Sequence, residues 1–116
     1  MITPLIERLF TRINEKGHLQ PLLPNYALTC AIHSDGEIIC FSFSKNEFFM
    51  LDDVEKVDVK LEGSIESILS VISGITTLRK TEINFTGSFR HKLLLDSIFT
   101  LGREKENILT DEKIVL

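Results

Sequence analysis

The sequence predicts a single α+β domain, and three features of the chain point to that class. An Asp35-Gly36 step separates two alternating apolar runs, which is a strong short-range signal of a β-hairpin. A strand, a Gly-Ser step and an apolar helix then follow one another twice, at Gly63-Ser64 and at Gly87-Ser88. Near the start, apolar residues recur at helical spacing. With 116 residues, the chain fits one domain with one core, at residues 1–116.

Residues 4–14 form the first expected helix. Thr3 and Pro4 suit the N-cap and the first helical position. The apolar side chains of one helical face are Leu5, Ile6, Leu9, Phe10 and Ile13. Gly17 suits the position that follows a helix C-terminus. Residues 18–25 contain two prolines and are expected to form an extended connector.

The Asp35-Gly36 turn joins expected strands at residues 26–33 and 37–44. With these two residues as the loop, Ile32 opposes Ile39 and Cys30 opposes Phe41. Because side chains alternate between the faces of a strand, this register gathers the large apolar groups on one face. That face carries Tyr26, Leu28, Cys30, Ile32, Ile39, Phe41 and Phe43. Cys30 and Cys40 then lie on opposite faces, so we expect two thiols and no disulfide, with Cys30 buried as a small hydrophobic residue.

The third expected strand, at residues 47–51, has two possible registers. A two-residue loop before it buries Phe48 and Met50, whereas a three-residue loop buries Phe49 and Leu51. Further strands are expected at residues 56–61 and 81–86, and further helices at residues 65–73 and 89–101.

Ser64 and Ser88 suit the N-caps of these two helices, although the helix N-termini could also bind a carboxylate or phosphate headgroup. Arg90, His91 and Lys92 form either a solvated first turn or a site for an acidic headgroup. Residues 103–116 are polar until Ile114 and are expected to form either a frayed extension or a short docking element.

The helix expected at residues 89–101 is unusually apolar. Its apolar side chains are Leu93, Leu94, Leu95, Ile98, Phe99 and Leu101. They cannot all face one sheet, because successive helical residues turn by about 100°. Some must therefore line a cavity or meet a partner, and surplus inward apolar surface in a small domain suggests a cavity for an apolar ligand.

Charge and composition exclude several classes of function. A formal net charge of −4, without a long basic cluster, argues against nucleic-acid binding. No apolar run is long enough to span a bilayer, and Glu7 and Arg8 interrupt the stretch where a signal peptide would be apolar. We therefore expect a cytoplasmic protein. Metal-ligand spacing and the common catalytic motifs are absent from the sequence, so we expect no metal, no cofactor and no enzymatic activity.

In their order along the chain, these elements resemble the sterol-binding domain of the sterol carrier protein type two family. The corresponding parts are the Asp35-Gly36 hairpin, the strand that ends at Glu62-Gly63-Ser64, the helix closed by Gly74, the strand that ends at Gly87, and the last apolar helix. The N-terminal helix matches as well, so the resemblance covers about nine-tenths of the chain.

Two departures from the family pattern bear on the ligand more than on the fold. Residues 75–80 lack the proline that is common there. The last helix begins with Ser88-Phe89-Arg90-His91, where many members of the family carry an acidic residue or Asn.

The resemblance implies a mostly antiparallel five-stranded sheet that is covered on one face by helices, with an apolar tunnel for a lipid tail between the layers. The expected lining comprises Phe10, Ile39, Phe41, Phe43, Ile68, Ile72, Phe85, Leu94, Ile98 and Phe99. Burial of an alkyl chain gains about 0.8 kcal/mol per methylene, so such a site needs no catalytic group. Each of these phenylalanines also has a simpler reading as ordinary core.

The implied function is non-enzymatic binding or transfer of an apolar lipid, such as a fatty acid, an acyl thioester or a sterol-like molecule, without stable insertion into a membrane. The alternative is a protein-interaction or dimerisation domain whose tunnel is closed, with a homodimer as one form.

Overall fold

In a computed structural model of the chain, residues 2–45, 47–52 and 54–103 are described. Five strands form one sheet in the order β3-β2-β1-β4-β5. Their bounds are Leu28–Ser34 for β1, Glu37–Phe43 for β2, Phe48–Leu51 for β3, Val59–Glu62 for β4 and Asn84–Thr86 for β5. Only the β1–β4 pair is parallel among these strands, so the expected mostly antiparallel α+β fold is confirmed.

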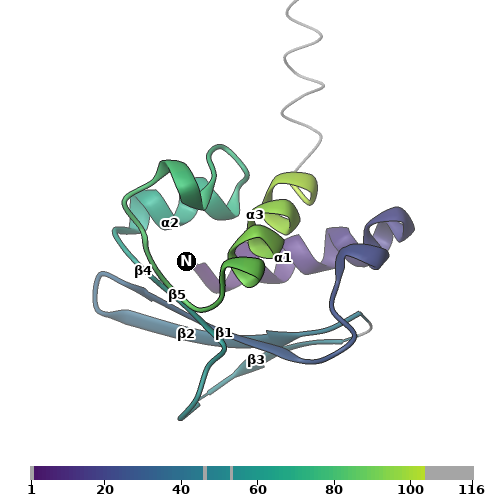
Figure 1. Cartoon of the computed structure of the whole chain (residues 1–116), viewed down its shortest axis with the longest axis horizontal. Coiled ribbons are helices and arrows are strands. Elements are labelled where there is room, and N and C mark those ends of the chain that lie inside the picture. The colour runs from purple at the N-terminus through teal and green to yellow at the C-terminus, as the bar shows by residue number, and fades with distance from the viewer. Residues whose placement is uncertain (1, 46, 53, 104–116) are drawn as a thin grey trace, which may run out of the picture.

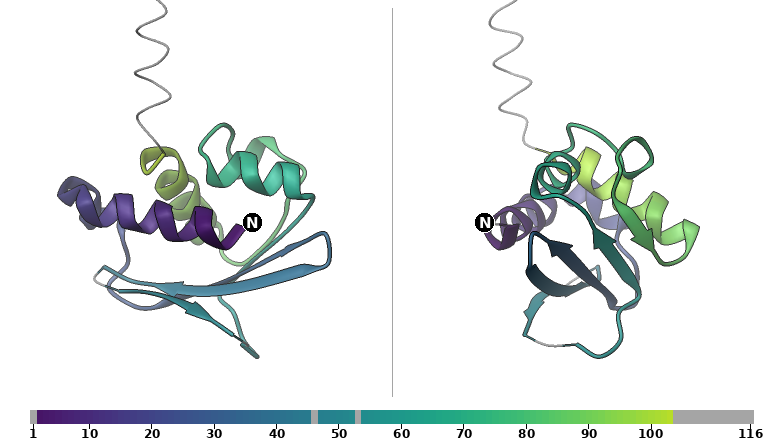
Figure 2. Two further views of the ribbon diagram at one scale, coloured as in Figure 1. Left: turned by 180° about the vertical axis from the view of Figure 1, so that it is seen from behind. Right: turned by 90° about the vertical axis from the view of Figure 1, so that its left-hand side faces the viewer.

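Three α-helices lie on one face of the sheet (Figures 1 and 2). They are α1 at Ile2–Glu15, α2 at Ile65–Ile72 and α3 at Phe89–Leu101. Two short 3₁₀ helices, η1 at Gly17–Leu22 and η2 at Leu78–Lys80, join this layer. Each expected helix and strand is present, and the bounds of α3 equal the expected ones.

The register predicted from the Asp35-Gly36 turn is confirmed. Ile32 pairs with Ile39, and Cys30 pairs with Phe41. Both turn residues have positive φ, 48° for Asp35 and 81° for Gly36, as a tight hairpin turn with Asn/Asp-Gly requires. The structure also decides between the two possible registers of the third strand, because Phe48 pairs with Phe43 and packs against the core. This is the register of the two-residue loop.

The connection from β3 to β4 crosses the face of the sheet that the helices leave uncovered (Figure 2, right-hand view). Leu51 pairs with Cys40, and Val59 pairs with Cys30 on the far side, so the chain crosses the sheet almost at one level. Asp58 anchors the end of the crossing, since its backbone N–H donates to the Thr29 carbonyl and its carboxylate accepts from the Thr29 N–H at 2.9 Å. Ala31 and Cys40, which pair with each other on this outer face, are both buried.

Cys30 faces the helices and Cys40 the opposite side, and no disulfide joins them. Burial, and to a lesser extent the Asp58 carboxylate, raises the pKa of the Cys30 thiol far above its ordinary value. We expect two thiols to titrate in denaturant without prior reduction, and Cys30 to stay unreactive in the folded protein at neutral and mildly alkaline pH. A rise in thiol count after reduction would contradict the assigned register.

Three expectations for the segment between the first helix and the sheet are wrong. Most of the connector expected at residues 18–25 belongs to the helix η1, which packs beside α1 and α3. Leu19 of this helix is buried, and so is Leu23, which follows its last residue. Gly17 begins this helix and has no positive φ. Tyr26 was expected on the core face but is 51% exposed, because β1 begins only at Leu28. Its hydroxyl instead lies 3.0 Å from Nε2 of His91 on α3.

The two serine N-caps predicted for α2 and α3 are confirmed, whereas Thr3, the predicted N-cap of the first helix, lies inside α1, which begins at Ile2. The Ser64 hydroxyl accepts from the Ser67 N–H, and the Ser88 hydroxyl accepts from the His91 N–H, each at 3.2 Å. Gly87, just before Ser88, has a φ of +145°, and a Cβ there would lie 2.9 Å from the Asp58 carbonyl oxygen. Glycine is therefore required at this step. It lets β5 turn into α3 directly beside the β3–β4 connection.

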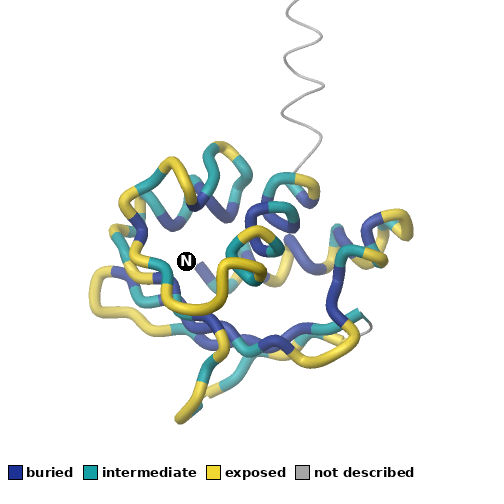
Figure 3. The backbone as a smooth tube through the Cα atoms, viewed as in Figure 1, coloured by how far each residue is buried: buried dark blue, intermediate teal, exposed yellow. Residues whose placement is uncertain are grey.

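The core fills the layer between the sheet and the helices, where buried segments of both layers face each other (Figure 3). Its largest fully buried side chains are Phe41, Phe43, Phe99, Ile2, Ile6, Leu9, Ile13, Leu28, Ile32, Leu61, Ile68 and Leu95. Residues 104–116, on which the two readings of the tail depend, lie outside the described part of the chain.

Candidate functional site

All ten side chains expected to line an apolar site belong to the sheet–helix layer. Seven are buried members of one core cluster: Phe10, Phe41, Phe43, Ile68, Ile72, Ile98 and Phe99. The other three, Ile39, Phe85 and Leu94, are partly buried and pack against that cluster. The fold thus brings the expected set together, from β2, β5 and all three α-helices. An open tunnel among these side chains remains a prediction.

An aromatic group occupies the centre of this layer, where α1 passes over β2 and β3. The Phe10 ring lies 4.8 Å from Phe43 and 4.6 Å from Phe48, measured between centroids. Phe41 lies 6.0 Å from Phe10 and 6.2 Å from Phe43. Such offset and tilted rings attract one another beyond the burial of their area. Phe48 was missing from the expected set because the register of β3 was left open.

The apolar surplus of α3 lies on its outer side. Leu95, Ile98 and Phe99 are buried against the core, as one face of the helix requires. Phe89 is 65% exposed, Leu93 39% and Leu101 50%. Of the six apolar residues counted from the sequence, Leu93 and Leu101 are thus exposed, and Phe89, which was not in that set, is exposed as well. These exposed side chains lie on the outer side of the helix. They are therefore available for contact with a partner or a surface.

A narrow apolar crevice reaches the surface between α1, η1 and the C-terminal half of α3. It is too thin to hold a water molecule, and the empty space between its atoms, including the open mouth, is about 160 Å³. Its walls are Ile13, Leu19, Leu22, Leu23, Ile98 and Leu101. Ile98 belongs to the set expected from the sequence, whereas the leucines of η1 were overlooked. The i, i+3, i+4 spacing of Leu19, Leu22 and Leu23 was the signal that could have revealed them.

A buried carboxylate fastens η2 to α3. Oδ1 of Asp96 accepts from the Leu78 N–H at 2.7 Å, and its Oδ2 is buried with no hydrogen-bond partner. Asp96 is only 8% exposed. Because a buried polar group is costly unless it is hydrogen-bonded, the bond between Asp96 and the Leu78 N–H holds η2 against α3.

A second pocket, of about 310 Å³, lies at the far end of the sheet beside the hairpin turn. It is open to solvent and has a mixed polar and apolar lining, and its walls are His33, Ser34, Asp35, Gly36, Glu37, Ile38, Glu62 and Gly63. Residues 2–45, 47–52 and 54–103 contain no group of three His, Cys, Asp or Glu side chains placed to hold a metal ion. Within the same ranges, no helix is both long and apolar enough to cross a membrane.

With the sheet order and the helical cover established, the fold can be compared with solved structures. A UbiJ-SCP2 ubiquinone synthesis protein aligns with a TM-score of 0.66 over 89% of this chain and 100% of its own, at 13% identity. The chain has the sterol carrier protein type two fold. No protein-family model and no curated protein sequence matches the chain.

Two further structures share the sterol carrier protein fold. The sterol carrier protein domain 2 of Helicoverpa armigera aligns with a TM-score of 0.57, covering 86% of this chain and 85% of its own at 14% identity. The palmitated SCP2L2 from Aedes aegypti aligns with a TM-score of 0.51, covering 81% of this chain and 93% of its own at 15% identity. At these identities the likeness is one of fold.

Proposed function

We propose that this protein binds or transfers an apolar lipid, held by its tail between the sheet and the helices. The observation that carries the proposal is the continuous apolar layer between β2, β5 and the three α-helices, in a fold shared with sterol carrier domains. One protein of this fold is described as palmitated, and another as a ubiquinone synthesis protein. Both descriptions support an apolar ligand.

The crevice between α1, η1 and α3 is the proposed entrance. It leads from half-exposed Leu101 to Ile98, which is buried in the core cluster. Because protein cores are close-packed, a tail can enter only if the layers separate at this edge. The 3₁₀ helix η1 is short, and its hydrogen-bond geometry is weaker than that of an α-helix, so it is the element proposed to yield.

The proposed driving force is the transfer of methylenes out of water, worth about 0.8 kcal/mol each. For a chain of about fourteen methylenes, this sum is about 11 kcal/mol, and it opposes the cost of separating the layers at the entrance. No described carboxylate lines the crevice, so the tail meets only hydrocarbon there. The ligand classes in question are a fatty acid, an acyl thioester and a sterol-like lipid.

A charge placed at the entrance tests this proposal. Leu22 is half-buried and lines the crevice, and Leu22→Asp should weaken binding of a fluorescent fatty acid by more than about tenfold, because a carboxylate there opposes the tail. Ile98→Asp should abolish binding too, but Ile98 is 1% exposed and the variant counts only if circular dichroism shows an intact fold.

Leu69→Asp is the matched control. Leu69 is also a half-buried leucine that packs against the core, but it lies on α2 and does not line the crevice. The affinity of the Leu69→Asp variant for the fluorescent fatty acid should stay within about threefold of the wild-type affinity. Equal losses in the two leucine variants would mean that stability, not the entrance, governs binding. A wild-type chain that binds no fatty acid, acyl thioester or sterol at micromolar concentration would favour the alternative of an interaction domain with a closed core.

A further inference from the structure

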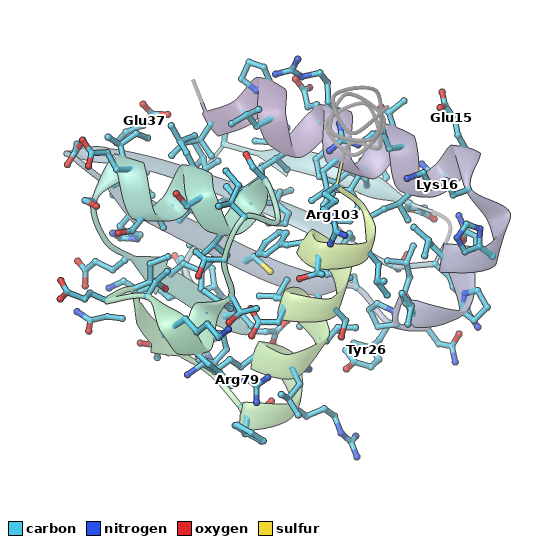
Figure 4. All side chains as sticks on the ribbon, turned by 90° about the horizontal axis from the view of Figure 1, so that it is seen from above. Glu15, Lys16, Tyr26, Glu37, Arg79 and Arg103 are labelled. Carbon is cyan, nitrogen blue, oxygen red and sulfur yellow. The ribbon has the colours of Figure 1, made fainter. Side chains whose placement is uncertain are left out.

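The outer side of α3 combines apolar and cationic side chains in a way that packing does not explain. Phe89, Leu93 and Leu101 are all more than one-third exposed along the helix, and half-exposed Tyr26 lies beside its first turns (Figure 4). These four residues are called the α3 face below. They are four of the seven large apolar side chains exposed in the described part of the chain.

Positive charge surrounds the α3 face. Arg90 and Lys92 belong to the first turn of α3, and the Lys92 ammonium lies 5.8 Å from the centroid of the Phe85 ring. Arg103 follows the last turn and donates to the Thr100 carbonyl at 3.0 Å. Arg79 of η2 lies beside the same N-terminal half (Figure 4). The one acidic residue of α3 is Asp96, which is buried and bonded to the Leu78 N–H. This concentration of cations stands in a chain with a net charge of −4.

The position of Arg90 and Lys92 in the first turn is unfavourable for the stability of α3. The N-terminus of a helix carries partial positive charge, so cations in the first turn oppose the helix dipole. The first turn of α2 instead carries Glu66. The Phe85 ring is a partner for Lys92 within the protein. The helix dipole does not explain the exposed Arg90 beside it, and an external anionic surface supplies an explanation.

We propose that the α3 face docks on the surface of an anionic membrane. An apolar line flanked by cations is the pattern by which a helix lies in the interface, with its aromatic and leucine side chains below the headgroups and its cations at the phosphates. A second copy of the chain fits this face poorly. Both ends of α3 are cationic, so two α3 faces packed in either direction would bring like charges together.

This docking also places the crevice against the bilayer. Leu101 belongs both to the α3 face and to the wall of the crevice. A lipid tail could then pass between membrane and protein without crossing water. This loading role rests on the proposed function, whereas the docking itself stands on the exposed residues and their charges.

Co-sedimentation of the full chain with vesicles tests the proposal. The chain should bind vesicles of phosphatidylcholine with phosphatidylglycerol, should leave vesicles of phosphatidylcholine alone in the supernatant, and should lose binding as salt is raised. In the double variant Arg90→Gln and Lys92→Gln, partition should fall by about thirty-fold, because each cation near an anionic leaflet contributes about fivefold. Gln is a good helix former, so α3 should persist.

Two further variants separate the charges from the apolar line. Phe89→Ser removes an exposed ring from the first position of α3 and should also weaken vesicle binding. Arg8→Gln removes an exposed cation from α1 and should leave partition within about twofold, as expected for a surface charge that is not part of the α3 face.

Failure of the wild type to bind anionic vesicles, or equal partition of the double variant and the wild type, would overturn the docking surface. A dimer in sedimentation velocity that Leu93→Ser dissociates would overturn it as well, since the face would then belong to a second copy. The two proposals fail separately. Fatty-acid binding without vesicle binding removes only the docking surface, and vesicle binding without fatty-acid binding removes only the lipid site.

Discussion

Replacing Phe41 with Ala should lower the free energy of unfolding by about 3–5 kcal/mol, the usual cost of truncating a buried phenylalanine. Phe41 is 1% exposed, and its ring contacts those of Phe10, Phe43 and Phe48. Small domains have only about 5–15 kcal/mol of stability, so the variant should be partly unfolded in mild denaturant. Urea unfolding followed by circular dichroism measures the change.

Phe49→Ala is the matched control for that measurement. Phe49 lies on the neighbouring strand but on the outer face, and it is 54% exposed. Its loss should change the unfolding free energy by no more than about 0.5 kcal/mol. If Phe49→Ala cost as much as Phe41→Ala, the register that places Phe48 and Met50 inward would be wrong.

Replacing Asp96 with Ala should cost about 2–3 kcal/mol, because it leaves the buried Leu78 N–H without an acceptor. The loss should appear in the same urea titration. It should also release η2 from α3, and faster hydrogen exchange at the Leu78 amide would report this directly.

Asp96→Asn separates the hydrogen bond from the rest of the side chain. The amide keeps an oxygen for the Leu78 N–H and removes a buried charge, so at least half of the loss seen in the Ala variant should be recovered. Equal losses in Asp96→Ala and Asp96→Asn would show that the bond between Oδ1 and Leu78 does not hold the two elements together.

Local turn chemistry explains why the sheet was predictable. The Asp35-Gly36 turn fixes the pairing of β1 and β2, and with period-two alternation it decides which side chains enter the core. Where the turn signal was weak, at Lys45, two registers remained open, and Phe48 was missed as a member of the aromatic group. Two prolines favoured an extended connector over η1, although the leucines around them carried helical spacing.

The α3 helix shows what periodicity alone cannot decide. The sequence revealed that its apolar residues exceed one face, and it left open whether the excess lines a cavity or meets a partner. The structure places Leu93 and Leu101 on the surface, together with Phe89, which was not in the expected set. Angular spacing fixes the relative directions of side chains on a helix, but the direction of the sheet depends on long-range packing. The ten expected site residues were nevertheless found together, because they belong to the inward faces.

A native mass spectrum of the full chain, purified gently from cells and then incubated with palmitate, tests the lipid-carrier account most directly. The account predicts one bound apolar lipid per chain in the native spectrum. It also predicts that the bound lipid is released on denaturation and that its amount is strongly reduced in Leu22→Asp but not in Leu69→Asp. A spectrum that shows only the bare chain, before and after incubation with palmitate, would contradict it.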